Sequence, residues 1–173
     1  MINNNFKKIL KCLFTYTNTN INALNIIGLD GAKIKEFWDD FYILQYLNTS
    51  LNTIINSDEI SSDVTGGVCI GFGAGSKQVS LEDYNLETII NNLSYQSSSV
   101  ETTEEGYTVI TSAKNNTSTD IIVSEVGIFC RGRSGHSGMD LRSQPFMLTR
   151  NVLETPITIK PNETKTFTIT INF

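Results

Sequence analysis

The sequence predicts an all-β protein: an antiparallel β-sandwich with a short N-terminal amphipathic helix. In the C-terminal part of the 173-residue chain, apolar and polar residues alternate with a period of two, the pattern of a strand with one buried face. Short polar turns, and no long helical pattern, separate these segments. Only 18% of the residues are charged, and Asn, Ser and Thr fill the gaps between apolar runs, a composition typical of strands and turns.

The first residues of the chain predict the helix. Five apolar residues recur there at i, i+3, i+4, i+7 and i+8 and form one face, with three lysines off that face. Packing of this face on its own domain or on a neighbouring subunit is favoured over contact with a membrane surface. We assign residues 1–20 to a helical arm and residues 21–173 to the sandwich domain. The apolar face consists of Phe6, Ile9, Leu10, Leu13 and Phe14.

The sequence also predicts where the protein is made. The N-terminal segment is a poor signal peptide, because Lys11 interrupts its apolar run and no small-residue cleavage site follows. No apolar run approaches the length of a transmembrane helix, so the sequence predicts no membrane partner. Cys12, Cys69 and Cys130 are widely spaced and form no Cys/His cluster, which favours a reducing compartment and argues against zinc. Cys69 and Cys130 lie in apolar runs and are predicted to be small buried residues.

Between residues 21 and 63 the pattern is mixed. Asp30-Gly31 lies between two apolar segments and predicts a two-residue hairpin turn, in which both turn positions need positive φ. Residues 37–57 contain the only tryptophan and fit either a helix or a pair of strands, with strands favoured after about residue 50.

From residue 64 onwards the sequence predicts a succession of strands. Residues 64–73 form a strand that ends in glycine, and residues 80–90 form a short turn-and-strand unit. The polar residues 93–105 predict an edge strand. Two strong strands then flank a turn at residues 115–118.

The last third of the sequence predicts a loop followed by further strands. Residues 131–144 are rich in Gly and Ser and predict the loop, and residues 145–153 predict a strand. In the final segment, apolar residues alternate with threonines, so one face is predicted to be buried and the other exposed to solvent. The apolar residues of this face are Phe167, Ile169, Ile171 and Phe173.

Three alternating glycines, Gly71, Gly73 and Gly75, raise the question of a phosphate-binding loop. The run lacks the third glycine of G-x-G-x-x-G spacing and the Lys-Ser/Thr of a Walker loop, and no amphipathic helix follows. Glycine at the end of a strand instead allows a bulge or a close approach of the backbone without a clash at Cβ. We therefore predict a structural role for these glycines.

The only histidine, His136, lies in the predicted loop among Ser134, Ser137 and Asp140. A catalytic Ser/His/Asp triad needs groups held rigidly by different elements, which one glycine-rich loop does not provide. We predict no catalytic residue there.

The same loop is rich in arginine, with Arg131, Arg133 and Arg142 inside it and Arg150 nearby. Arginine binds carboxylates or phosphates through two hydrogen bonds. The absence of aromatic residues between positions 131 and 145 argues against a nucleic-acid site, as does the net charge of −5. A solvated loop is slightly favoured, and the functional prediction for these arginines is contact with an acidic face of a neighbouring subunit.

Acidic residues are concentrated in the middle of the chain. Residues 1–35 carry a net charge of +4, residues 36–125 carry −12, and residues 126–173 carry +3. Such asymmetry fits either solvated surfaces or complementary faces between copies in an assembly. Adjacent acids, as at Glu82-Asp83, are predicted to be exposed, and no calcium-loop spacing occurs. The sequence therefore predicts no metal and no cofactor.

Four short elements resemble those of a group of small tailed-bacteriophage virion proteins. That group carries a Gly-x-Gly element, a DYxLE element, an S/T-EIGLF strand and an L-x-R-x-VL element, followed by a Thr-rich last strand. Phe72 and residues 36–60 differ from the pattern. The corresponding elements here are GFG at 71–73, DYNLE at 83–87, SEVGIF at 124–129 and LTRNVL at 148–153.

The resemblance implies a non-enzymatic structural component of a tailed-phage virion, in head decoration or fibre attachment, neck or tail. It implies that the partners are copies of the protein itself and other virion proteins, in a homo-oligomer made in the host cytoplasm. The arm and the arginines described above are the predicted sites of contact. The alternative is a module that binds a host surface or a carbohydrate, with Trp38 and Tyr42 as candidates for stacking on sugar rings. An enzyme such as a glycan hydrolase is least favoured, because no convincing nucleophile or metal set is present.

Overall fold

The structure is a computed structural model that describes residues 27–33, 42–43, 68–103, 106–134 and 142–172. The predicted helical arm with its five-residue apolar face, Trp38, His136 and Phe173 lie outside the described residues. The division into an arm and a sandwich domain therefore stays a prediction.

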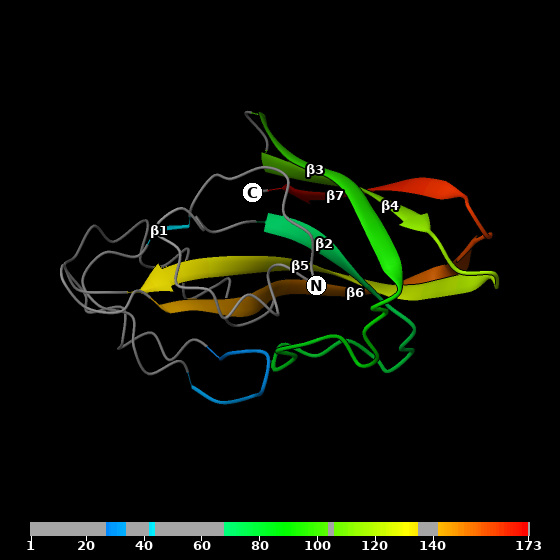
Figure 1. The fold of residues 1–173 in the computed structure, drawn as a ribbon. Helices are drawn as coiled ribbons and strands as arrows, with labels where there is room; N and C mark the ends of the chain where they lie inside the picture. The colour runs from blue at the N-terminus through cyan, green and yellow to red at the C-terminus, as the bar shows by residue number, and fades with distance from the viewer. Residues whose placement is uncertain (1–26, 34–41, 44–67, 104–105, 135–141, 173) are drawn as a thin grey trace.

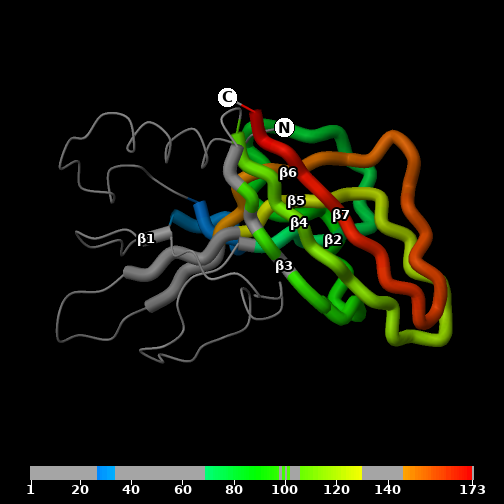
Figure 2. Tube along the Cα trace, turned by 90° about the horizontal axis from the view of Figure 1, so that it is seen from above, coloured from blue at the N-terminus to red at the C-terminus, as the bar shows by residue number. Residues whose placement is uncertain are grey.

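The described residues form two antiparallel sheets, which confirms the predicted fold class (Figure 1). In the first sheet β5 is central, with β6 on one side and β1 and β2 pairing successive stretches of the other. The second sheet has the order β3-β4-β7, so β3 is the edge strand that its polar sequence predicts (Figure 2). The strands are β1 (Tyr42–Ile43), β2 (Val68–Gly73), β3 (Leu93–Thr103), β4 (Gly106–Asn115), β5 (Ile121–Ser134), β6 (Arg142–Ile159) and β7 (Thr164–Asn172).

The main core lies between the two sheets and follows the predicted alternation. In β7, Phe167 and Ile171 are buried while the intervening threonines are exposed, as the sequence predicts. The Phe167 ring packs against Phe72 of β2, with 4.6 Å between ring centroids. On the outer face of this sheet the threonines pair across strands, as between Thr108 and Thr170 at 3.2 Å. Period-two alternation thus places one apolar face inward on each sheet.

The first sheet is covered on both faces. A second apolar cluster, Cys69, Leu86, Phe129 and Met147, lies on its outer face, away from β3-β4-β7. Residues 74–90, which we call the strap, pass over this face and contribute Leu86 to the cluster (Figure 1). Burial on both faces explains why β2 and β5 have nearly continuous apolar runs rather than clean alternation. It also confirms that Cys69 is a buried apolar residue.

Asn115 joins the two sheets at one end of the sandwich. The predicted turn at residues 115–118 connects β4 in one sheet to β5 in the other and does not form a hairpin. Asn115 is fully buried, and its Nδ2 donates to Thr119 O at 2.7 Å and to Ile159 O at 2.9 Å. Its Oδ1 accepts from Thr117 N at 2.8 Å. One side chain thus fixes the β4–β5 turn and the end of β6 together.

The predicted two-residue turn at Asp30-Gly31 is wrong in its geometry. Gly31 N donates to Gly28 O at 3.1 Å, and Gly28 N donates to Ala32 O at 2.9 Å, so the turn includes more residues than two. Gly31 has φ 79°, and Asp30 is not among the residues with positive φ. Asp30 accepts a hydrogen bond from Ala32 N through Oδ1 instead. A turn followed by one glycine in the left-handed region therefore replaces the expected turn with two such positions.

The predicted loop at 131–144 is shorter than expected. β5 continues to Ser134, and β6 begins at Arg142, which pairs with it. The backbones of Arg131 and Arg133 pair with Pro145 and Ser143 in the same ladder. The placement of these arginines in a loop is therefore wrong, because pairing with β6 overrides the local turn preference of Gly and Ser. The predicted unit at 80–90 is likewise mostly turn, with a single bridge between Gly73 and Ile89.

Replacement of Asn115 by alanine tests the junction between the sheets. We expect Asn115→Ala to lower the free energy of unfolding by about 2–3 kcal/mol, because buried backbone carbonyls lose their donor. Urea denaturation followed by circular dichroism measures the change. The exposed neighbour Asn116 is the control, and Asn116→Ala should leave the stability nearly unchanged. Equal effects of the two substitutions would contradict this role.

Candidate functional site

A bulge in the β5–β6 ladder, with its extra residues in β6, turns Glu125 out of the main core. Val123 and Val126 both face the core between the sheets, which strict alternation does not allow. The β5–β6 register shifts between Val123 and Glu125, where residues 153–156 of β6 face a single residue of β5. A bulge inverts the side-chain phase of a strand. Glu125 consequently lies on the face covered by the strap instead of beside Val123.

A second bulge does the same for Arg150. Phe146 and Leu148 of β6 belong to the main core, so alternation alone would point Arg150 into it. The register shifts between Ile128 and Phe129, and Arg150 pairs with Gly127. Both ionisable side chains are thereby delivered to the same face of the sheet.

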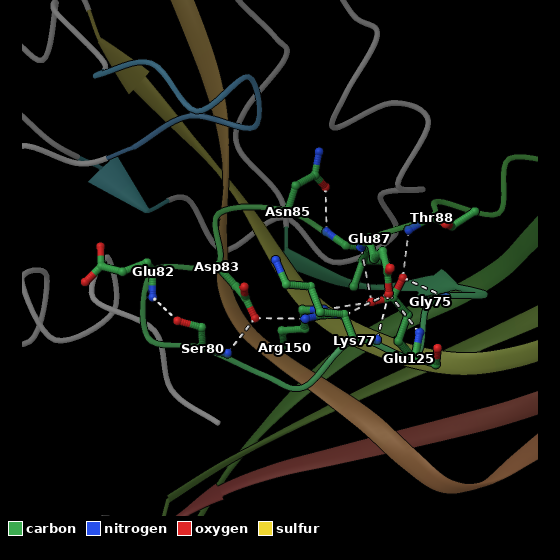
Figure 3. A network of polar contacts seen from close by, with 12 residues as sticks. Gly75, Lys77, Ser80, Glu82, Asp83, Asn85, Glu87, Thr88, Glu125 and Arg150 are labelled. Atoms are coloured by element: carbon green, nitrogen blue, oxygen red, sulfur yellow. Dashed lines mark hydrogen bonds and ion pairs between the residues drawn. The ribbon is translucent and has the colours of Figure 1, made fainter.

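Arg150 and Glu125 form a buried ion pair beneath the strap (Figure 3). Arg150 Nε donates to Glu125 Oε2 at 2.7 Å, and the two side chains are 2% and 0% exposed. Arg150 Nη1 donates to Asp83 Oδ2 at 2.9 Å, and Nη2 lies 3.7 Å from Glu87 Oε2. Burial alone would lower the pKa of Arg150, but the Asp83 and Glu125 carboxylates outweigh it and raise this pKa above its usual value. The guanidinium therefore stays charged.

Glu125 also holds the backbone of the strap. Its Oε1 accepts from Gly75 N at 3.0 Å and from Thr88 N at 2.9 Å, and its Oε2 accepts from Glu87 N at 3.2 Å. Together with Arg150 Nε, this gives the carboxylate four donors, which matches its number of lone-pair positions. A buried charge is tolerated when it is paired and hydrogen-bonded in this way.

Two further carboxylates, both on the strap, accept hydrogen bonds from other strap residues. Glu87 Oε2 accepts from Ser76 N at 2.8 Å and from Lys77 N at 2.7 Å. These two backbone donors are the main reason that the pKa of Glu87 lies below its ordinary value. Asp83 Oδ2 accepts from Ser80 N at 2.8 Å, in addition to Arg150. The strap has little regular secondary structure, so carboxylates accept many of the backbone hydrogen bonds that a neighbouring strand would otherwise accept.

Gly73 and Gly75 make room for the Glu125 carboxylate. A Cβ on Gly73 would collide with the Glu125 side chain, and a Cβ on Gly75 would lie 2.5 Å from Glu125 Oε1. The prediction that these glycines allow a close approach is confirmed, but a carboxylate side chain, and not backbone, is what approaches Gly73. A loop whose spacing suggests phosphate binding thus wraps an anion supplied by the protein itself.

The network is suited to holding the fold and not to reaction chemistry. A catalytic carboxylate must reach the proton or the atom that it acts on. Glu125 is fully buried, and the hydrogen bonds above occupy both of its oxygens. Arg150 is likewise engaged with Asp83 and Glu125.

The outcome for the predicted site residues is mixed. Asp83 is only 13% exposed, so the expectation that the Glu82-Asp83 pair is exposed is wrong for Asp83. Arg150 binds carboxylates of its own chain, so its role differs from the subunit contact predicted for the arginines with which the sequence grouped it. Contact of Arg131, Arg133 and Arg142 with a neighbouring subunit stays a prediction, as does docking through the arm.

A groove between β6 and β7 is the other candidate site. It has a volume of about 610 Å³, and none of its lining residues is ionisable. Leu153, Ile157 and Ile169 line it together with threonines of β7 and the asparagines Asn151 and Asn172. Such a lining supports contact with a ligand or a partner and offers no acid or base for catalysis.

Two absences are limited to the described residues. There, no group of three or more His, Cys, Asp or Glu side chains is arranged to hold a metal ion. Within the same ranges, no helix has the length and apolar character needed to span a membrane.

Comparison with known proteins adds no identification. No family model, curated protein or solved structure matches this chain. The fold and the charge network are therefore the basis for any statement about its role.

Removal of the arginine tests the buried pair. We expect Arg150→Met to lower the free energy of unfolding by about 3–5 kcal/mol, because it leaves Glu125 buried without its counter-ion. Arg150→Lys keeps the charge but loses the forked geometry and should have a smaller effect. Chemical denaturation measures both variants.

The exposed pair Lys165–Glu163, with 3.6 Å between Nζ and Oε1, supplies the control. Lys165→Met should leave the denaturation midpoint unchanged, since exposed pairs contribute little. An Arg150→Met variant as stable as Lys165→Met would show that the buried pair contributes nothing.

A methyl group at Gly75 tests the close approach. Gly75→Ala should lower the free energy of unfolding by about 1–3 kcal/mol, because the added carbon displaces the Glu125 carboxylate. Hydrogen exchange should increase in residues 75–88 more than in β4. Ala74→Ser, at the exposed position beside it, is the control. Unchanged exchange in Gly75→Ala would argue that the carboxylate moves freely.

Proposed function

We propose that this protein is a non-enzymatic structural component of a tailed-phage virion and that it assembles through subunit contacts. The observation that carries the proposal is the position of the residues behind the resemblance. Gly73 and Asp83 lie in one network with Glu125 and Arg150, and each belongs to a different one of the four elements. The shared pattern therefore records how the fold is held and not a reactive centre.

The surface properties support the same proposal. A protein that acts by repetition uses its outer faces, and both sheets here are stabilised internally, which leaves loops, edges and the arm for contacts. The separation of acidic and basic stretches along the chain would give complementary faces between copies. Position on the particle does not follow from these features.

A second candidate function is recognition of a carbohydrate or host surface. The groove between β6 and β7 favours it, because its volume of about 610 Å³ is within the range of small-ligand sites. Hydroxyl and amide groups beside apolar side chains suit a sugar. A glycan array that shows no binding would count against this candidate and leave the structural role in place.

Truncation of the arm tests assembly. We expect a variant lacking residues 1–18 to fold, with the β-sheet circular dichroism of the full chain, and to lose its oligomers or its incorporation into particles. The reason is loss of the apolar docking face of the arm. Light scattering after size exclusion and negative-stain electron microscopy measure assembly.

The matched control keeps the apolar face and changes the other side of the predicted helix. Replacement of Lys7, Lys8 and Lys11 by glutamine should preserve assembly. A truncated protein that assembles normally would contradict the role of the arm. A full chain that stays monomeric and enters no particle would contradict the proposed function itself.

A further inference from the structure

We propose that the strap, residues 74–90, is an acid-released latch: protonation of the carboxylates that hold it frees the strap and uncovers the apolar outer face of the first sheet. This inference goes beyond the proposed function and does not depend on it.

Carboxylates take part in most of the polar contacts between the strap and the sheet. Of the six strap N–H groups that donate to carboxylates, three bind Glu125 of β5 and three bind Glu87 or Asp83 of the strap itself, which in turn face Arg150. Backbone hydrogen bonding between the strap and β2 is confined to the end of the strap, where Ile90 N donates to Phe72 O at 2.9 Å, while Ala74 N donates to Thr88 O within the strap, also at 2.9 Å. The donors to carboxylates are the backbone N–H groups of Gly75, Ser76, Lys77, Ser80, Glu87 and Thr88.

Protonation of these carboxylates removes contacts and provides none. An ionised carboxylate only accepts hydrogen bonds, whereas a protonated one carries a donor O–H. Around Glu125 that O–H would face the N–H groups of Gly75, Thr88 or Glu87 or the guanidinium, and all of these are donors. At least one hydrogen bond must therefore be lost.

Arg150 makes the loss cooperative. It contacts Glu125 and Asp83 directly and lies 3.7 Å from Glu87, so neutralising any of them weakens the compensation of a cation that is 2% exposed. An uncompensated buried cation is costly, and release of the strap restores its hydration. The same residue that stabilises the closed strap at neutral pH favours opening in acid.

The direction of the pH effect follows from the groups that face this network. On the strap these are Lys77, Asp83 and Glu87, and the sheet contributes Glu125 and Arg150. Arg150 stays charged throughout the acid range. A carboxylate with a lowered pKa in the folded state, such as Glu87, adds stability above its unfolded pKa and loses it as the pH falls through the folded value. Opening is therefore expected at a pH below the ordinary glutamate pKa of 4.5.

An apolar surface with a reporter thiol lies beneath the strap. Leu86 of the strap packs on Cys69, Phe129 and Met147, and all four are buried. The main core between the sheets is a separate cluster. Leu29 and Tyr95 also pack against this cluster from outside the strap. Release of the strap would therefore remove the cover that Leu86 and Ile89 provide and make Cys69 more accessible while the sandwich stays folded, which is local opening and not global unfolding.

Thiol labelling across a pH series tests the latch. The full-length protein is treated with 4,4′-dithiodipyridine between pH 7 and pH 3, and modification of Cys69 is followed by peptide mass spectrometry. Rates are normalised to a free cysteine peptide at each pH. We expect the normalised rate at Cys69 to rise at least 10-fold below about pH 4.5, with the far-ultraviolet β signal unchanged.

Variants at neutral pH separate the latch from general acid damage. Glu87→Gln and Asp83→Asn should each raise the Cys69 rate several-fold at pH 7. Glu163→Gln is the matched control, because Glu163 also accepts a backbone hydrogen bond, from Lys160 N at 2.7 Å, but lies in the β6–β7 turn. It should leave the Cys69 rate unchanged.

Three results would overturn the inference. Protection of Cys69 that persists to pH 3 would show that the carboxylates do not hold the strap. Loss of protection only at the pH where the β signal collapses would show global unfolding. An equal effect of Glu163→Gln and Glu87→Gln would remove the link to the strap. None of these results bears on assembly into particles, so the proposed function stands or falls separately.

Discussion

The need to compensate two buried charges, Arg150 and Glu125, organises the first sheet and the strap that covers its outer face. A carboxylate with no exposure to solvent requires a cation and a full set of donors. Two bulges bring the pair to one face of the sheet, two glycines make room for it, and the strap brings the remaining donors. Without the pair, the strap would keep its apolar contacts but lose most of its polar contacts with the sheet.

This constraint also explains why the strand sequences are irregular. Ile121 and Val123 set one phase of alternation in β5, and Val126 and Ile128 set the opposite one. A regular strand would place Glu125 in the core between the sheets, where an ionised group without partners costs several kcal/mol, on the order of a domain's whole stability. The bulges are therefore the structural solution to an acidic and a basic residue in otherwise apolar strands.

The sequence predicts the strands well where one face is buried and the other is exposed. The final strand is an example, since its Phe and Ile positions are inside and its Thr positions outside. Prediction fails where a partner far along the chain determines the local structure. Turn residues at 131–134 are incorporated into β5 because β6 pairs with them, and Asp83 is largely withdrawn from solvent because Arg150 binds it across 67 residues. A break in the alternation at Glu125 and at Arg150 was the available signal for the network, since an ionisable residue in an apolar phase requires a partner.

The long sequence separations within the network also bear on the order in which the molecule folds. β5 and β6 adjoin in the chain and can pair early, whereas Glu125 meets strap residues 37 to 50 positions away. Closure of such loops is slow relative to local pairing. The pairing of β2 with β5, from Gly73 with Glu125 to Val68 with Cys130, also joins residues far apart in the chain, so the sandwich depends on distant closures as well. Glu125 and Arg150 lose their hydration only when the strap closes over them and supplies the remaining partners.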